Sequence, residues 1–378
     1  MSQRPNIIYL NSHDTGRAIG PMGYRIHTPH LQRLAEEGVL FRDCHCAAPT
    51  CSPSRAALIT GEAPHCNGML GLAHRGWGLQ DHSRTIPAVL LEQGYRTAAW
   101  GMPANHCIGP EHGEPEASSE RMGYGDWLGW DLEQLTGFLG SDHDRPFFLS
   151  ASWGLTHRAA PAGRGFGAEP DHERYDPRYC APPPLLPDDA ETRADWAWFC
   201  SAATELDRQM GAVIQAVEEA GLAEQTLIIA TTDHGIPFPG NKCELTASGT
   251  GVFLIMRGPG GFTGGQSIDH LVSQLDIFPS ICQMLDLPAP AWLQGVPLQA
   301  TLGPEGHPIH DQLQAEVTYH AAYEPKRALR TDRWLYVRRF GCRRQPVLSN
   351  RDHGASKDHW VASGWRDQVE ADEELYDT

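Results

Sequence analysis

Two pairs of acid and imidazole side chains stand where a metal site could form. His13 and Asp14 directly follow one short apolar run, and Asp233 and His234 end another such run more than 200 residues later. If the two runs are neighbouring strands of one sheet, the four side chains meet in space, and such oxygen and imidazole ligands suit a divalent metal ion. After a strand, Asp and His also serve as turn formers and caps, which explains either pair alone. The two pairs together favour the metal site.

A third candidate is Cys51, the first residue of the stretch CSPSRAALITG. Its thiolate could act as a nucleophile or as a metal ligand. Cys51 also stands at the start of a predicted helix, with Arg55 one turn further on, and this combination attracts oxyanions. In the alternative interpretation, Cys51 is a small buried residue beside a helix cap. The spacing alone leaves these interpretations open.

The other cysteines do not indicate a disulfide framework. The chain has 10 cysteines, and they are scattered from Cys44 to Cys342. A structural zinc site needs paired CxxC-type spacing, which Cys44, Cys46 and Cys51 approach without matching. We therefore expect most of the cysteines to be buried free thiols.

The elements that must position these residues alternate between strand and helix. Short apolar runs predict strands at 6–12, 96–102, 147–153, 226–233 and 251–258. Helical periodicity predicts helices at 29–41, 54–61, 85–94, about 192–220 and 273–285. This alternation predicts an α/β fold with a largely parallel central sheet flanked by helices. In such sheets, functional residues gather at the carboxyl ends of the strands.

The last part of the chain has a different pattern. Residues 316–340 contain two strand-like halves separated by a turn, which is typical of a short antiparallel sheet. We therefore expect a catalytic α/β domain at 1–300 and a small C-terminal α+β subdomain at 301–378. Residues 158–190 are rich in Pro, Gly and charged residues, and they should form a long excursion over the surface of the first domain.

Composition and charge narrow the class of partner. The 378 residues are 40% hydrophobic, as expected for a globular protein with a large core. The formal net charge of −17 opposes nonspecific binding to nucleic acid or to acidic membranes. No apolar run reaches the length of a membrane span, and the first residues do not read as a signal peptide. We expect a cytoplasmic protein without nucleic-acid or membrane partners, and the composition indicates no particular oligomeric state.

Taken in order, the motifs resemble those of the sulfatase family, within the alkaline phosphatase superfamily. CSPSR followed by AALITG is similar to the sulfatase signature, and PNIIYLNSHD is similar to the family's first strand with its metal-binding acids. TTDHGIPFPGNK resembles the second metal-binding pair and the lysine that follows it. Within the family, the signature region and the block EVTYHAAY look most like the heparan N-sulfatase (sulfamidase) type. The resemblance covers nearly the whole chain and implies an alkaline phosphatase-like sandwich.

The resemblance implies a specific chemistry for Cys51. A formylglycine-generating enzyme would oxidise the cysteine to formylglycine, whose hydrate attacks sulfur and later expels sulfate. The substrate would be a small-molecule or saccharide sulfate, either a sulfate ester or a sulfamate. One divalent metal ion, Ca2+ in the family, would be held by His13, Asp14, Cys51, Asp233 and His234.

The resemblance also assigns catalytic roles beside Cys51. Arg55 would hold the nucleophile and offset its charge, since a guanidinium presents a rigid fork of donors. Lys242 matches the lysine that contacts the sulfate group, and His106 matches a histidine of the family's Lys-x-His motif. His157 matches the histidine that contacts sulfate or protonates the leaving group.

Two departures from the family pattern concern the metal. His13 stands where sulfatases usually carry an acid, and His234 stands where they usually carry an asparagine. Imidazole is a softer ligand than a carboxylate or an amide oxygen, so the change favours Mn2+ or Zn2+ over Ca2+. The Asp233–His234 pair also resembles the pair in the phosphonate monoester hydrolases and phosphodiesterases of the superfamily. Hydrolysis of a phosphonate monoester or a phosphodiester is therefore an alternative function.

A third departure concerns the lysine of the Lys-x-His motif. The stretch GMPANHCIGPE keeps His106 but has no lysine. Asn105, Arg75 or His74 could supply the missing contact, and the sequence does not choose among them. Together with His13, the missing lysine allows a second alternative, a family member that keeps the fold without turnover. The intact CSPSR stretch opposes that alternative.

Overall fold

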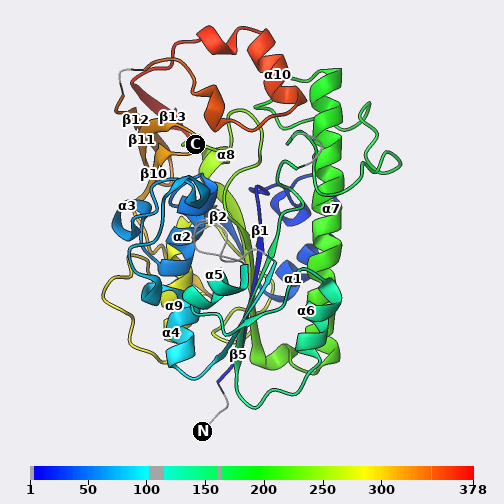
Figure 1. Cartoon of the computed structure of the whole chain (residues 1–378), viewed down its shortest axis with the longest axis vertical. Coiled ribbons are helices and arrows are strands. Elements are labelled where there is room, and N and C mark those ends of the chain that lie inside the picture. Colours follow the sequence, from blue (N-terminus) through cyan, green and yellow to red (C-terminus); the bar gives the residue numbers. More distant parts are fainter. Residues whose placement is uncertain (1–3, 102–114, 160–162, 342) are drawn as a thin grey trace.

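A nine-stranded sheet forms the centre of the computed structural model, which describes residues 4–101, 115–159, 163–341 and 343–378 (Figure 1). Its strands follow the order β4-β3-β5-β1-β6-β7-β2-β8, with β9 paired to β2. The bounds are β1 (Asn6–Ser12), β2 (Val39–His45), β3 (Arg96–Gly101), β4 (Asp126–Trp127), β5 (Phe147–Trp153), β6 (Thr226–Thr232), β7 (Gly251–Arg257), β8 (Gln266–Ile268) and β9 (Val272–Ser273). Strand β7 runs antiparallel to both of its neighbours, whereas the other pairings are parallel. The predicted α/β fold with a largely parallel sheet is confirmed.

Helices cover both faces of this sheet (Figure 1). Their bounds are α1 (Pro29–Glu37), α2 (Cys51–Thr60), α3 (Pro64–Asn67), α4 (Ile86–Glu92), α5 (Pro115–Arg121), α6 (Leu132–Leu139), α7 (Ala190–Glu219), α8 (Ala247–Thr250), α9 (Ile277–Met284) and α10 (Ala355–Ala362). In β1, Ile8 and Leu10 pack in one core with α1, α6 and α7, and Ile7 and Tyr9 pack in a second core with α2, α4 and α9. A strand covered on both faces reads as a continuous apolar run, which is why the inner strands were predictable.

The helix predicted at 29–41 was too long. Helix α1 ends at Glu37, and Val39 begins strand β2, which pairs with β7. The break lies at Gly38, where a Cβ atom would come within 2.4 Å of the carbonyl oxygen of Met256. Only glycine allows the chain to pass so close to β7. The apolar residues after Gly38 fit a buried strand as well as a helix, so periodicity could not separate the two.

The C-terminal region adds a four-stranded antiparallel sheet in the order β10-β11-β12-β13. Its strands are β10 (Leu313–Tyr319), β11 (Tyr323–Arg330), β12 (Trp334–Arg339) and β13 (Glu373–Asp377). The N–H of Glu316 donates to the carbonyl of Ala47, and the N–H of Tyr319 donates to the carbonyl of Leu70. The small sheet therefore contacts the segments on either side of α2. The domain boundary at residue 300 remains a prediction.

The segment between β5 and α7 has no helix or strand in its described residues, consistent with the expected excursion. It is nevertheless tied to the core. Phe166 and Tyr175 are buried against residues of α7, and the Arg158 guanidinium makes a buried ion pair with Asp195. Of the helices in the described ranges, none has the length and apolarity needed to cross a bilayer.

Candidate active site

Asp14 of the first predicted pair meets Asp233 and His234 of the second because β1 and β6 are adjacent parallel strands. In the register of this strand pair, Ser12 lies opposite Thr232, so the backbone leaves both strands at the same edge of the sheet. The backbone N–H of Asp14 then donates to Asp233 Oδ1 at 2.8 Å. Asp14 has φ = 57°, a left-handed conformation that is uncommon for a residue with a side chain. A strained backbone of this kind is found where surrounding contacts hold a functional side chain in place.

Four buried side chains converge at this edge. Asp14, Cys51, Asp233 and His234 each present one potential ligand atom, and these atoms all lie within 4.8 Å of one another. His234 Nε2 is 3.3 Å from Asp14 Oδ1 and 3.5 Å from Asp233 Oδ2. Burial alone would raise the pKa of the Asp233 carboxyl, but His234 and Arg55 hold it well below its usual range. Asp233 is therefore ionised at neutral pH.

The donor set fits a divalent metal ion. Among the described residues, Asp14 Oδ1 and His234 Nε2 are buried and have no hydrogen-bond partner. His234 Nδ1 lies 3.0 Å from the carbonyl oxygen of Gly235 and can donate to it, which leaves the lone pair of Nε2 facing the two carboxylates. Buried polar atoms without partners are costly, and a bound cation would satisfy both of them. Carboxylate oxygen, imidazole nitrogen and sulfur are all common metal ligands.

Cys51 reaches this group because it is the first residue of α2, a helix whose residues are all buried. Arg55 lies one helical turn further on, and its Nη2 donates to Asp233 Oδ2 at 2.5 Å. Arg55 Nε and Nη1 are buried without a partner in the described part of the chain, so two strong donors remain available beside Cys51. Burial raises the pKa of the Cys51 thiol to about 12. As a thiol, residue 51 is thus a poor nucleophile at neutral pH.

Lys242 and His157 lie on the other side of Asp14. Lys242 Nζ donates to Asp14 Oδ2 at 2.8 Å and also lies 2.9 Å from Asp352 Oδ2. His157 Nε2 is 3.9 Å from Asp14 Oδ2, and its Nδ1 lies 2.7 Å from the carbonyl oxygen of Arg158. The His157 side chain is 38% exposed, whereas that of Lys242 is 3% exposed. His157 therefore lies at the solvent side of the site and Lys242 lies inside it.

Other predicted residues are placed differently. His13 does not belong to the group of four; its Nε2 lies 3.4 Å from Ser152 Oγ, and its ring lies 5.8 Å from the ring of His157. His106 and Asn105 lie outside the described residues. His74 and Arg75 are exposed, and Arg75 Nη1 donates to the carbonyl of Ala321 in the turn between β10 and β11.

Two residues near the site were missed by the sequence analysis. Asp352 contacts Lys242, and His320 is buried close enough to Lys242 and His234 for both to affect its pKa. Burial, followed by the charge of Lys242, lowers the pKa of His320 to about 3, so its imidazole is neutral. Both residues lie after position 300: His320 directly follows β10, and Asp352 lies in an irregular segment after β12. Only the fold brings them to the site.

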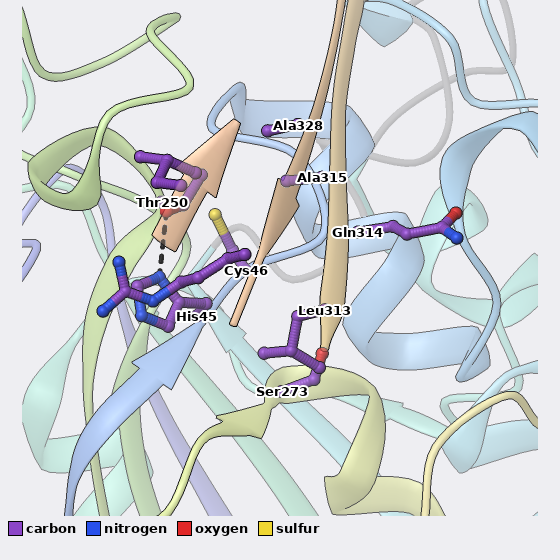
Figure 2. A pocket seen from close by; sticks show the side chains of 10 residues that line it. His45, Cys46, Thr250, Ser273, Leu313, Gln314, Ala315 and Ala328 are labelled. Carbon is purple, nitrogen blue, oxygen red and sulfur yellow. Dashed lines mark hydrogen bonds between the residues drawn. The ribbon is translucent and has the colours of Figure 1, made fainter. Parts of the chain in front are cut away.

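A separate narrow pocket lies between the two sheets (Figure 2). Figure 2 shows His45 and Cys46, from the end of β2, facing Ala315 and Ala328 of the small sheet, with His45 hydrogen-bonded to Thr250. The lining includes none of the four converging residues. This pocket marks the junction of the sheets and not the candidate active site.

Sequence comparison with known proteins finds a sulfatase family model and relatives named as a sulphohydrolase and a sulfatase. The family model described as Sulfatase matches residues 5–287. Human N-sulphoglucosamine sulphohydrolase is 32% identical over 292 residues, which cover 71% of this chain and 58% of the human protein. A sulfatase from Formosa agariphila described as ulvan-active is 27% identical, over 90% of this chain and 61% of its own length. The chain thus spans about three fifths of the length of these two curated relatives.

Solved structures share the fold at lower identity. One, described as a complex with its substrate D-glucosamine-2-N,6-O-disulfate, aligns with a TM-score of 0.70 at 17% identity and covers 99% of this chain and 91% of its own. The phosphonate monoester hydrolase of Agrobacterium radiobacter aligns with a TM-score of 0.67 at 19% identity, covering 89% of this chain and 87% of its own. At such identities these likenesses show the fold alone.

Proposed function

The chain belongs to the sulfatase family, and from this premise we propose that it hydrolyses a sulfate ester or sulfamate of a sugar, with Cys51 as the precursor of its nucleophile. The observation that carries the proposal is the convergence of Cys51, Arg55 and Lys242 on the Asp14–Asp233 pair. A nucleophile position, two cations and a metal-ligand set in one buried site are what transfer of an anionic group requires.

The substrate class rests on the relatives. The human relative is named for hydrolysis of N-sulphoglucosamine, and one structural neighbour is described with a disulfated glucosamine as its substrate. Both names concern sulfated amino sugars. We propose a saccharide sulfate for this chain, and a formylglycine-generating enzyme as the partner that converts Cys51.

Each residue of the site has a proposed role that follows from its position. Formylglycine at position 51 would supply the hydroxyl nucleophile that the buried thiol cannot provide. A divalent ion held by Asp14, Asp233, His234 and residue 51 would supply Lewis acidity toward that hydroxyl and toward a sulfate oxygen. Arg55 would bind the oxygens at position 51 through its two free donors. Lys242 would hold the sulfate group, and the half-exposed His157 would give a proton to the leaving oxygen or nitrogen.

For the metal we propose Mn2+ or Zn2+ in preference to Ca2+, because the imidazole of His234 is the softer ligand. Replacing His234 with Asn should lower the affinity for Zn2+ by about tenfold or more, while the affinity for Ca2+ changes less. Calorimetric titration of both ions measures the difference. His310→Asn is the matched control, since His310 pairs with Asp276 away from the site. Equal losses for both ions would contradict the assignment.

A rate comparison tests the proposed function. Protein produced with a formylglycine-generating enzyme and loaded with metal should cleave an aryl sulfate or N-sulfoglucosamine with a kcat/KM at least about tenfold above that for the matched aryl phosphonate or aryl phosphate diester. Faster cleavage of the phosphorus esters would favour the alternative hydrolase. No turnover of either class, in protein shown to carry formylglycine and metal, would favour a non-catalytic family member.

A further inference from the structure

Lys242 lies between two carboxylates in the candidate site. Its Nζ is 2.8 Å from Asp14 Oδ2 and 2.9 Å from Asp352 Oδ2. Both the lysine and Asp14 are almost completely buried, and the Asp352 side chain is 17% exposed. These two contacts hold the ammonium group of Lys242 from two sides.

Asp352 is held in place by a network of buried charges. Its neighbour Arg351 makes ion pairs with Glu244 and Glu324, and Lys326 pairs with the same two glutamates. Asn350, two positions before Asp352, donates to Glu324 Oε2 at 2.7 Å. These contacts join the segment after β12 to the start of β11 and to the loop that carries Lys242. The position of Asp352 is thus set by the C-terminal sheet.

The ionisable groups that face Asp352 come from several elements: Lys242 and His157, and also His320, which is neutral. Burial would raise the pKa of the Asp352 carboxyl, but Lys242 first, and then His157, lower it well below its usual range. Asp352 is therefore an anion. Of its partners, Lys242 and His157 are the two groups to which the proposed function gives contact with the sulfate or the leaving group.

Asp14 and Asp352 differ in what else they do. Asp14 belongs to the four residues that fit a metal ion, and its Oδ1 is directed toward His234. Its carboxylate is thus shared between Lys242 and the metal site. Asp352 is not part of that group. A carboxylate outside the metal site can hold the ammonium group whether or not a metal ion is bound.

We propose that Asp352 is a positioning residue of the active site, which holds Lys242 beside position 51 so that its ammonium group meets the sulfate. The kinetic part of this inference rests on the proposed function, whereas the structural part does not. It also assigns the C-terminal region a part in the chemistry, because the segment after β12 supplies the carboxylate and residues of β11 help to hold that segment.

The side-chain ammonium signal of Lys242 provides a direct test. The chain contains only three lysines, Lys242, Lys326 and Lys357, so 15N-lysine labelling yields at most three ammonium signals, and Lys242→Met identifies one of them. In Asp352→Asn, the Lys242 signal should shift or exchange faster with water, in both metal-free and Zn2+-loaded protein. The Lys326 signal should stay in place. Asp207→Asn is the matched control, because Asp207 is a buried carboxylate that accepts from the backbone N–H groups of His30 and Leu31, and it should leave the Lys242 signal unchanged.

An unchanged Lys242 signal in Asp352→Asn would overturn the proposal. A simultaneous shift of the Lys242 and Lys326 signals together with a lower Tm would also overturn it, because it would show a general structural role. Asp352→Glu retains the carboxylate and should restore most of the wild-type Lys242 signal.

Kinetics on an aryl sulfate give the second readout. Asp352→Asn should lower kcat/KM by about 10- to 100-fold, as is typical when the partner of an active-site group is removed. We expect the loss mainly in kcat, since Lys242 acts on charge that develops in the transition state. Asp352→Glu should recover part of it, and an unchanged kcat in Asp352→Asn would contradict the inference. If wild-type protein turns over no sulfate, the proposed function fails, and the ammonium signal still decides the structural part.

Discussion

Replacing Cys51 with Ala is expected to abolish turnover, with a loss in kcat of about 10,000-fold or more, as occurs when a covalent nucleophile is removed. The fold should survive, because the substitution removes a single buried sulfur atom at the first residue of α2. Initial rates on the best sulfate substrate, with circular dichroism to verify folding, give the measurement. Retained turnover would show that position 51 is not the nucleophile.

Cys46 offers a matched control for this substitution. It is a buried cysteine five residues before Cys51, and it is not one of the four residues that converge on the metal position. Cys46→Ala should therefore keep most of the activity. A comparable loss in both variants would indicate that a buried thiol in this region matters for packing and not for chemistry.

The same position can be tested by mass. The tryptic fragment 43–55 of protein produced with the maturation enzyme should be about 18 mass units lighter than the unmodified fragment, since conversion of a thiol to an aldehyde removes that mass. The fragment contains Cys44, Cys46 and Cys51, so fragmentation must place the change at residue 51. An unmodified thiol in active protein would overturn the proposed role of formylglycine.

Replacing Asp233 with Ala should remove both metal binding and activity. The Asp233 carboxylate connects the parts of the site, because it accepts hydrogen bonds from the backbone N–H groups of Asp14 and His234 and from the Arg55 guanidinium. Lewis-acid stabilisation is worth several kcal/mol, so kcat/KM should fall by about 1,000-fold or more. Metal content after dialysis and calorimetric titration measure the first effect, and initial rates measure the second.

The control for this variant is Asp207→Asn. Asp207 is a buried carboxylate of α7 that accepts from the backbone N–H groups of His30 and Leu31, far from the site in sequence and in contacts. It should bind metal like the wild type. If Asp233→Ala retained its metal ion, the ligand set proposed here would be wrong.

The sequence alone predicted five strands of the central sheet and the acid and imidazole residues that follow two of them. Strands β1, β5 and β6 were predictable because strands buried on both faces are continuous apolar runs, and the residues after them are the ones that parallel strands bring together. The stretch around Cys51 and Arg55 indicated the proposed nucleophile position through its resemblance to a known signature. These features are local, so they can be recognised without knowing the partners.

Only the tertiary structure decided the features that depend on contacts between segments far apart in the chain. The sequence could not separate strand β2 from the end of α1. Residues after Gly38 form a strand because they pair with β7, and Gly38 allows the close approach to β7. His13 and Asp14 are neighbours in the chain, yet only Asp14 belongs to the four residues that could hold a metal ion, whereas His13 Nε2 lies 3.4 Å from Ser152 Oγ of β5. Asp352 reaches Lys242 across 110 residues, and no local pattern encodes that contact, because the C-terminal sheet must first pack beside α2.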